Sequence, residues 1–71
     1  MDFCDRLSEL KQSRGATLSQ LAEAVGISPR ALKYYASGER EPSLSTLIAL
    51  ADFFDVSLDY LVGRSEEPGR R

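Results

Sequence analysis

Three side chains that can form strong hydrogen bonds lie close together near the middle of the chain: Arg30, Lys33 and Tyr34. At these spacings a helix would place all three on one face. Arginine can donate two parallel hydrogen bonds to the O6 and N7 atoms of guanine, and lysine can donate one to the same atoms; tyrosine can pack on a thymine methyl group or donate to phosphate. The simpler interpretation is an exposed helix face whose charges only keep the chain soluble. The flanking residues bear on the choice between these two interpretations.

The segment that carries these side chains has the start and end signals of a short helix. Ser28 supplies a hydroxyl at the N-cap and Pro29 occupies the first helical position, a favoured combination. The helix is predicted over Pro29–Ala36 and is closed by Ser37 and Gly38. Leu32 and Tyr35 are expected to anchor its inner face. The outward face then carries Pro29, Arg30, Lys33, Tyr34 and Ser37.

A second short helix is predicted directly before this one, over Leu18–Val25. Thr17 is a good N-cap, and the apolar residues behind it recur at helical spacing. Gly26 follows the last of them, where a left-handed backbone is easiest for a residue without Cβ. Two short helices joined by a tight turn containing glycine are typical of a helix-turn-helix motif, whose second helix usually enters the major groove of DNA.

Three further helices complete an all-α prediction of five helices. They are expected at about Asp2–Ser13, after a cap at Ser43, and over Leu58–Val62 between a cap at Ser57 and Gly63. No segment alternates long enough for a strand. One domain is therefore predicted over residues 1–63, with the motif at about 18–37, and residues 64–71 are expected to be a disordered polar tail. The predicted core comprises Phe3, Leu7, Leu10, Leu18, Leu21, Val25, Ile27, Leu32, Tyr35, Leu44, Leu47, Ile48, Ala51, Phe54, Val56, Leu58 and Leu61.

The composition of the chain disfavours enzymes, metal sites and membrane proteins. Its single cysteine, Cys4, cannot form an intramolecular disulfide, and the chain has no histidine to join it in a zinc site or a catalytic pair. We therefore expect no catalytic residue, no metal and no cofactor. No apolar run is long enough for a membrane span and no signal peptide opens the chain, so a cytoplasmic location with no membrane partner is expected.

The net charge of −2 is unevenly distributed along the sequence. Residues 11–40 carry five basic and two acidic side chains, a local net charge of +3, whereas residues 41–63 carry four acidic side chains and no basic one. DNA binding requires a basic face rather than a basic protein, because electrostatic attraction fades over about 8–10 Å in physiological salt. The predicted field is weak, which favours modest non-specific affinity and dependence on dimerisation.

Several segments together resemble one known family. The run LAEAVGIS, then Ala31, Leu32 and Tyr35, then SGEREPSLSTLIALADFFDVSLDYLVG resemble the lambda-repressor-like (Cro/CI or Xre-type) DNA-binding domains, from about Phe3 to Gly63. The resemblance implies sequence-specific binding of double-stranded DNA by a prokaryotic or phage transcriptional regulator, a repressor acting as a dimer. Some domains of this fold bind other proteins instead, for example as antitoxin components, and this alternative stays open.

The resemblance implies DNA contacts from the helix pair and the turns beside it. In the family, the first two residues and the sixth residue of the second helix read bases most often, which here are Pro29, Arg30 and Tyr34. Leu18 replaces a glutamine that grips a phosphate in well-known members, so that contact is absent or has moved. Arg14 and Ser45 are further candidates for phosphate contact. The predicted DNA-binding residues are Thr17, Ser19, Ser28, Pro29, Arg30, Lys33, Tyr34, Ser37, Arg40 and Ser43.

Leu50, Phe53 and Tyr60 remain once the predicted core is filled. Many relatives pair through this region, so the functional interpretation is a two-fold homodimer interface, with an inverted-repeat operator as the DNA partner. The simpler interpretation is that these side chains fold over the edge of a small core.

Overall fold

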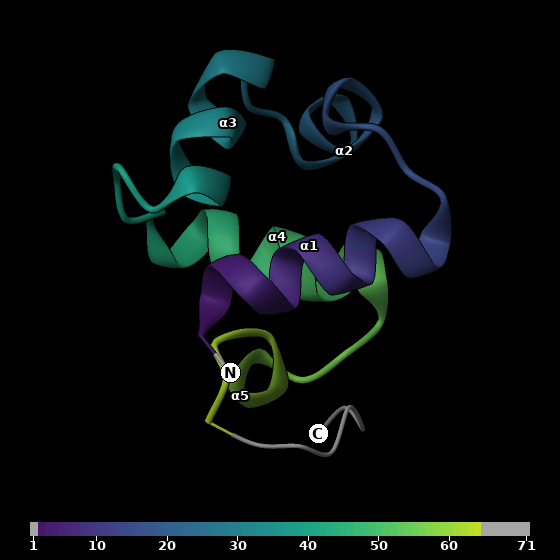
Figure 1. The fold of residues 1–71 in the computed structure, drawn as a ribbon, viewed down its shortest axis with the longest axis vertical. Helices are drawn as coiled ribbons and strands as arrows, with labels where there is room; N and C mark the ends of the chain where they lie inside the picture. Colours follow the sequence, from purple (N-terminus) through teal and green to yellow (C-terminus); the bar gives the residue numbers. More distant parts are fainter. Residues whose placement is uncertain (1, 65–71) are drawn as a thin grey trace.

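The computed structural model describes residues 2–64, and within this range it contains five α-helices and no strand. The helices are α1 (Phe3–Arg14), α2 (Leu18–Val25), α3 (Pro29–Ser37), α4 (Leu44–Phe54) and α5 (Leu58–Leu61). Figure 1 shows α2 and α3 at one end, α1 and α4 across the middle, and α5 at the other end. The all-α prediction is confirmed, while residues 65–71 of the predicted tail lie outside the described range. None of these helices is long and apolar enough to cross a lipid bilayer.

The helices begin at the hydroxyl caps that the sequence predicts. The caps of α2 to α5 are Thr17, Ser28, Ser43 and Ser57, and each side-chain oxygen accepts a hydrogen bond from the amide three residues further on. The first helix differs by one residue from its prediction, because Asp2 is its cap and the helix ends at Arg14. Each cap pairs an amide that the helix itself leaves without a partner, which is typically worth about 1 kcal/mol.

Gly26 determines the turn between α2 and α3. Its φ angle of 79° lies in the left-handed region, and the amide of the next residue, Ile27, donates to the carbonyl of Ala22 over 3.0 Å. A side chain at this position would strain the backbone, because L-residues with a Cβ rarely adopt such angles. The tight turn therefore fixes the angle at which α3 leaves α2.

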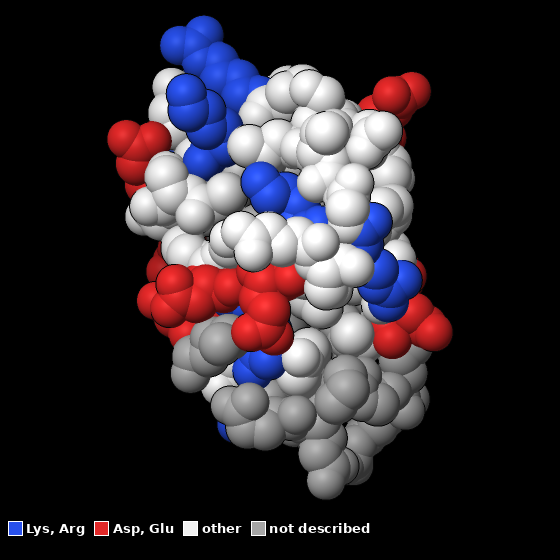
Figure 2. Space-filling view, turned by 45° about the vertical axis from the view of Figure 1, so that its right-hand side comes forward, with Lys and Arg blue, Asp and Glu red and all other residues white. Residues whose placement is uncertain are grey.

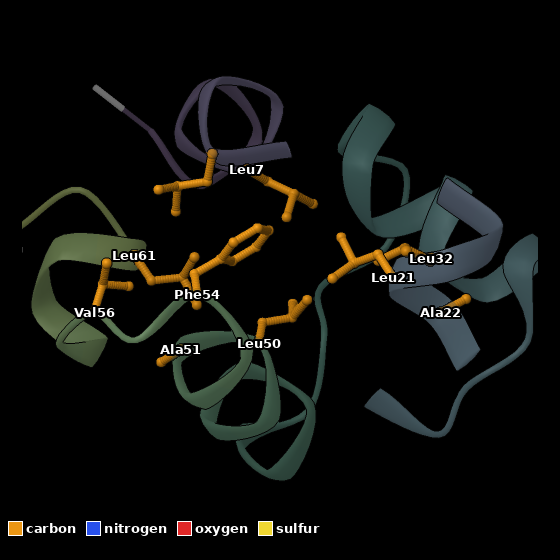
Figure 3. Close-up of a cluster of buried hydrophobic side chains, with 10 residues drawn as sticks. Leu7, Leu21, Ala22, Leu32, Leu50, Ala51, Phe54, Val56 and Leu61 are labelled. Atoms are coloured by element: carbon orange, nitrogen blue, oxygen red, sulfur yellow. The ribbon is translucent and has the colours of Figure 1, made fainter. Parts of the chain in front are cut away.

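The core lies between α1, α4 and α5 on one side and the helix pair on the other. Figure 3 shows the Phe54 ring in the middle of the cluster, between Leu7 of α1 and Leu50 of α4. The buried apolar residues are Leu7, Leu10, Leu21, Ala22, Leu32, Leu50, Ala51, Phe54, Val56 and Leu61. Packing of α3 against both α1 and α2 holds it in place.

The inward face of α4 differs from the prediction. Leu44 and Ile48, predicted in the core, are 64% and 45% exposed, whereas Leu50, predicted at a dimer interface, is fully buried. The inward stripe includes Thr46, a polar residue, whose hydroxyl oxygen lies 3.0 Å from that of Ser43. Because the Thr46 hydroxyl is hydrogen-bonded, burying it costs little free energy. The inward face of α4 therefore differs from the stripe that apolar spacing alone indicates.

Two arginines of α1 make contacts within the domain, one of them buried and the other exposed. Arg6 is buried, with its guanidinium carbon 3.8 Å from the centroid of the Tyr60 ring, and it pairs with Glu9. The Arg14 guanidinium donates to the carbonyl of Phe54 near the end of α4. Arg14, a candidate for phosphate contact in the sequence, therefore has a structural partner.

Candidate nucleic-acid interface

The α3 helix has one face in the core and one in solvent. Leu32 is fully buried, while Pro29, Arg30 and Lys33 are exposed and Tyr34 is half-buried. Ser37, at the last position of the helix, is also exposed. The outward side chains are those that the sequence predicts for this face, although Tyr35, predicted in the core, is only half-buried.

Tyr34 connects two arginines on this surface. The Arg30 Nε–H donates to the Tyr34 hydroxyl oxygen over 3.4 Å, from one helical turn earlier. Arg40, in the loop after α3, places its guanidinium carbon 4.9 Å from the centroid of the Tyr34 ring, within the range of a cation–π contact. Residues that the sequence predicts separately as DNA-binding are thus assembled into one cluster.

The exposed hydroxyl groups beside α3 act chiefly as helix caps. Thr17 Oγ1 accepts from the amide of Gln20, and the Gln20 side-chain oxygen accepts from the Thr17 amide in return. Ser28 Oγ accepts from the Ala31 amide, and Ser43 Oγ accepts from the Thr46 amide. A hydroxyl that accepts at a cap still has a hydrogen to donate, so both roles are chemically compatible at Thr17 and Ser28. The Ser43 hydroxyl also lies 3.1 Å from the Ser45 hydroxyl and 3.0 Å from the Thr46 hydroxyl.

Gln20 has a role that the residue-by-residue prediction missed. Threonine followed three residues later by glutamine is a capping-box pattern, and this signal is readable from the sequence.

Leu18, at the position where well-known members of the resembled family carry a glutamine, is half-buried and packs against the core. Ser19 is exposed in the first turn of α2, where backbone amides also point outward.

Ser37 is already engaged in hydrogen bonds. Its Oγ lies 3.1 Å from the carbonyl oxygen of Tyr34 and 3.2 Å from Glu39 Oε2. A serine hydroxyl has one hydrogen, so it cannot donate to a ligand without releasing these acceptors. Ser37 is therefore a weaker candidate for DNA contact than the sequence indicates.

The surface charge is unevenly distributed along the molecule. Figure 2 shows blue side chains projecting from the end that contains α2 and α3, with red side chains at its two edges, while the larger red groups lie further down beside other blue side chains. This agrees with the positive charge of residues 11–40 and the negative charge of residues 41–63. Within residues 2–64, no group of three or more His, Cys, Asp or Glu side chains is placed to hold a metal ion.

Curated relatives match nearly the whole chain. The HTH-type transcriptional regulator AnsR of Bacillus subtilis is 41% identical over 89% of this chain and 54% of its own length. The cryptic phage CTXphi transcriptional repressor RstR of Vibrio cholerae is 36% identical over 90% of this chain and 57% of its own length. The chain thus spans a little over half the length of these relatives.

Solved structures and a family model agree with these relatives. The crystal structure of the P22 c2 repressor protein in complex with a synthetic operator superimposes with a TM-score of 0.84 at 25% identity, covering 92% of this chain and 98% of that one. The helix-turn-helix family model matches residues 7–61, which include both helices of the motif and most of the core. The chain therefore belongs to the lambda-repressor-like (Cro/CI, Xre-type) helix-turn-helix family.

Proposed function

We propose that this chain binds double-stranded DNA in a sequence-specific manner, as the DNA-binding part of a prokaryotic or phage transcriptional regulator, with α3 in the major groove. The observation that carries the proposal is the division of α3 into a buried Leu32 and an exposed face with Arg30 and Lys33. The P22 c2 repressor, which has the same fold, was solved with a synthetic operator. Occupancy of an operator would block access of the polymerase and so repress transcription.

The proposed contacts divide into base reading and backbone positioning. Arg30 lies in the first turn of α3, the part of a recognition helix that reaches furthest into the groove, and it would read a guanine. Lys33 and Arg40 would bind phosphates, which position the protein without reading sequence. The amides in the first turn of α2, beside Thr17 and Ser19, and the Ser28 and Ser43 hydroxyls would add neutral phosphate contacts.

Enrichment of bound sites from random DNA, followed by salt titration of the best site, tests this function. We expect one enriched motif and a linear fall of log K with log salt concentration. If two or three phosphates are neutralised per protomer, the slope for a dimer should be about −4 to −5. If no motif is enriched and the affinity for DNA does not change with salt concentration, the proposal of DNA recognition is contradicted. The alternative, a protein-interaction module, would then be favoured.

We also propose that two copies pair on DNA around a two-fold axis, since one short helix and a weak positive field give little affinity alone. Phe53 is 39% exposed, which supports a place for it in the paired surface. Tyr60 is half-buried and one face of its ring is covered by Arg6, so that face is not available to a second copy. Leu50 is excluded from this surface because it is fully buried.

The pairing proposal predicts inverted repeats with half-sites about 34 Å apart, or one DNA turn from centre to centre. DNA that contains only one half-site should bind at least roughly tenfold more weakly than DNA with the full inverted repeat, because the second protomer loses its base contacts. Gel-shift titrations with full and half sites, combined with the mass of each complex, provide the measurement. Equal affinities with one protein per DNA on both sites would refute pairing.

A further inference from the structure

Tyr34 is the point at which the α3 helix and the loop after it are joined. Besides its two arginine contacts, its carbonyl oxygen accepts from the amide of Glu39 over 3.0 Å and lies 3.4 Å from the amide of Arg40. The loop that carries Arg40 is thus attached to the same residue whose ring lies beneath the Arg40 guanidinium. Tyr34 itself is half-buried and therefore less free to move than the exposed arginines.

These contacts constrain which hydrogen bonds Arg30 can make. Its Nε–H is directed to the Tyr34 hydroxyl oxygen, which leaves the two terminal amino groups, Nη1 and Nη2, for an outside acceptor. Those two groups form the end of the guanidinium fork and match the spacing of guanine O6 and N7. An exposed arginine without this contact would sample many rotamers, and ordering them on binding lowers affinity.

The ring of Tyr34 acts on Arg40 in a different way. A cation above an aromatic face is held by the ring quadrupole, and this contact needs the ring but not the hydroxyl. The planar guanidinium stays charged and keeps its donors at the edge while its face is stacked. Arg40 can therefore donate to a phosphate oxygen from a position that the ring has already restricted.

We propose that Tyr34 is a positioning residue that aligns two arginines for DNA: its hydroxyl orients Arg30 toward a guanine, and its ring holds Arg40 toward the phosphate backbone. The inference rests on the proposed function and assigns Tyr34 a role distinct from direct base contact. Two parts of one side chain would thereby control sequence specificity and general affinity separately.

Two substitutions separate these roles. Tyr34→Phe keeps the ring and removes the hydroxyl, so preference for the base pair read by Arg30 should fall about two- to tenfold, with binding to unrelated DNA unchanged. Tyr34→Leu removes both contacts, so binding to unrelated DNA should also weaken, by roughly two- to threefold. Thermal melting of both variants should show that each remains folded at the temperature of the titrations.

Double-mutant cycles test whether Tyr34 acts through the arginines. In an Arg30→Ala background, Tyr34→Phe should have no further effect on specificity, because the group that it positions is gone. In an Arg40→Ala background, Tyr34→Leu should no longer weaken binding to unrelated DNA. Equal losses with and without the arginines would show that Tyr34 contacts DNA itself and would overturn the inference, as would a Tyr34→Phe variant that matches the wild type.

Nuclear magnetic resonance of the free protein provides a readout that needs no DNA. The Arg40 side-chain protons should show ring-current shifts that persist in Tyr34→Phe and vanish in Tyr34→Leu, whereas the Arg30 Nε–H signal should change in both variants. Unshifted Arg40 protons in the wild type would refute the positioning role even if the protein binds its site. Failure of the wild type to select any DNA sequence would instead refute the proposed function.

Discussion

Phe54→Ala is expected to lower the free energy of unfolding by about 3–5 kcal/mol, the usual cost of deleting a fully buried aromatic ring. The Phe54 side chain has no exposed surface, and its ring lies at the centre of the core. Natural domains have only roughly 5–15 kcal/mol of stability, and a chain of 71 residues belongs at the low end. Urea and thermal unfolding followed by circular dichroism should show a large loss or a variant that is already unfolded.

Phe53→Ala is the matched control, because the same ring is deleted one residue away. The Phe53 side chain is 39% exposed and meets Phe54 edge to face, with ring centroids 5.1 Å apart. Loss of that pair and of the covered part of the ring should cost about 1–2 kcal/mol, less than the loss of the fully buried Phe54 ring. Similar losses for the two variants would mean that α4 does not present Phe54 to the core as described.

Arg30→Ala is expected to weaken binding to the preferred site by about 1–3 kcal/mol and to relax specificity at one base position. The side chain is exposed, so its removal should leave the unfolding free energy nearly unchanged. Fluorescence anisotropy with the enriched site and its single-base variants measures both effects.

Lys33→Ala provides the contrast on the same helix face. A phosphate contact carries no sequence information, so its loss should weaken all sequences alike and reduce the salt slope by about 1. Unchanged affinity in both variants, with the fold intact, would remove α3 from the DNA interface.

The helix pair could be predicted closely from the sequence because its signals are local. Ser28 and Pro29 define the start of α3, and the left-handed Gly26 defines the end of α2. The bounds of these helices therefore depend little on long-range contacts. The predicted bounds of α2 match the structure, and α3 is one residue longer than predicted, ending at Ser37.

The orientation of α4 could not be predicted in the same way. Apolar residues occupy most of its positions, so their spacing fits more than one inward stripe. In the structure the inward stripe includes Thr46 and Leu50, and the contacts of α4 with α2 and α5 determine this orientation. The same holds for Arg14 and Phe54, which are 40 residues apart and meet only in the folded chain.

The cluster around Tyr34 is intermediate between these cases. Sequence spacing places Arg30 and Tyr34 one turn apart on a helix, and this is a local inference. The approach of Arg40 depends on how the loop after α3 returns, which the sequence pattern did not define. The candidate residues were therefore predictable, whereas their mutual arrangement was not.

Methylation interference on the enriched site tests the central claim, that the exposed face of α3 reads bases in the major groove, most directly. Methylation of guanine N7 blocks an acceptor in the major groove, whereas methylation of adenine N3 lies in the minor groove. We predict that N7 methylation of one guanine per half-site abolishes binding of the wild type and has no further effect on Arg30→Ala. Interference confined to adenine N3, or an identical guanine pattern for the two proteins, would contradict the claim.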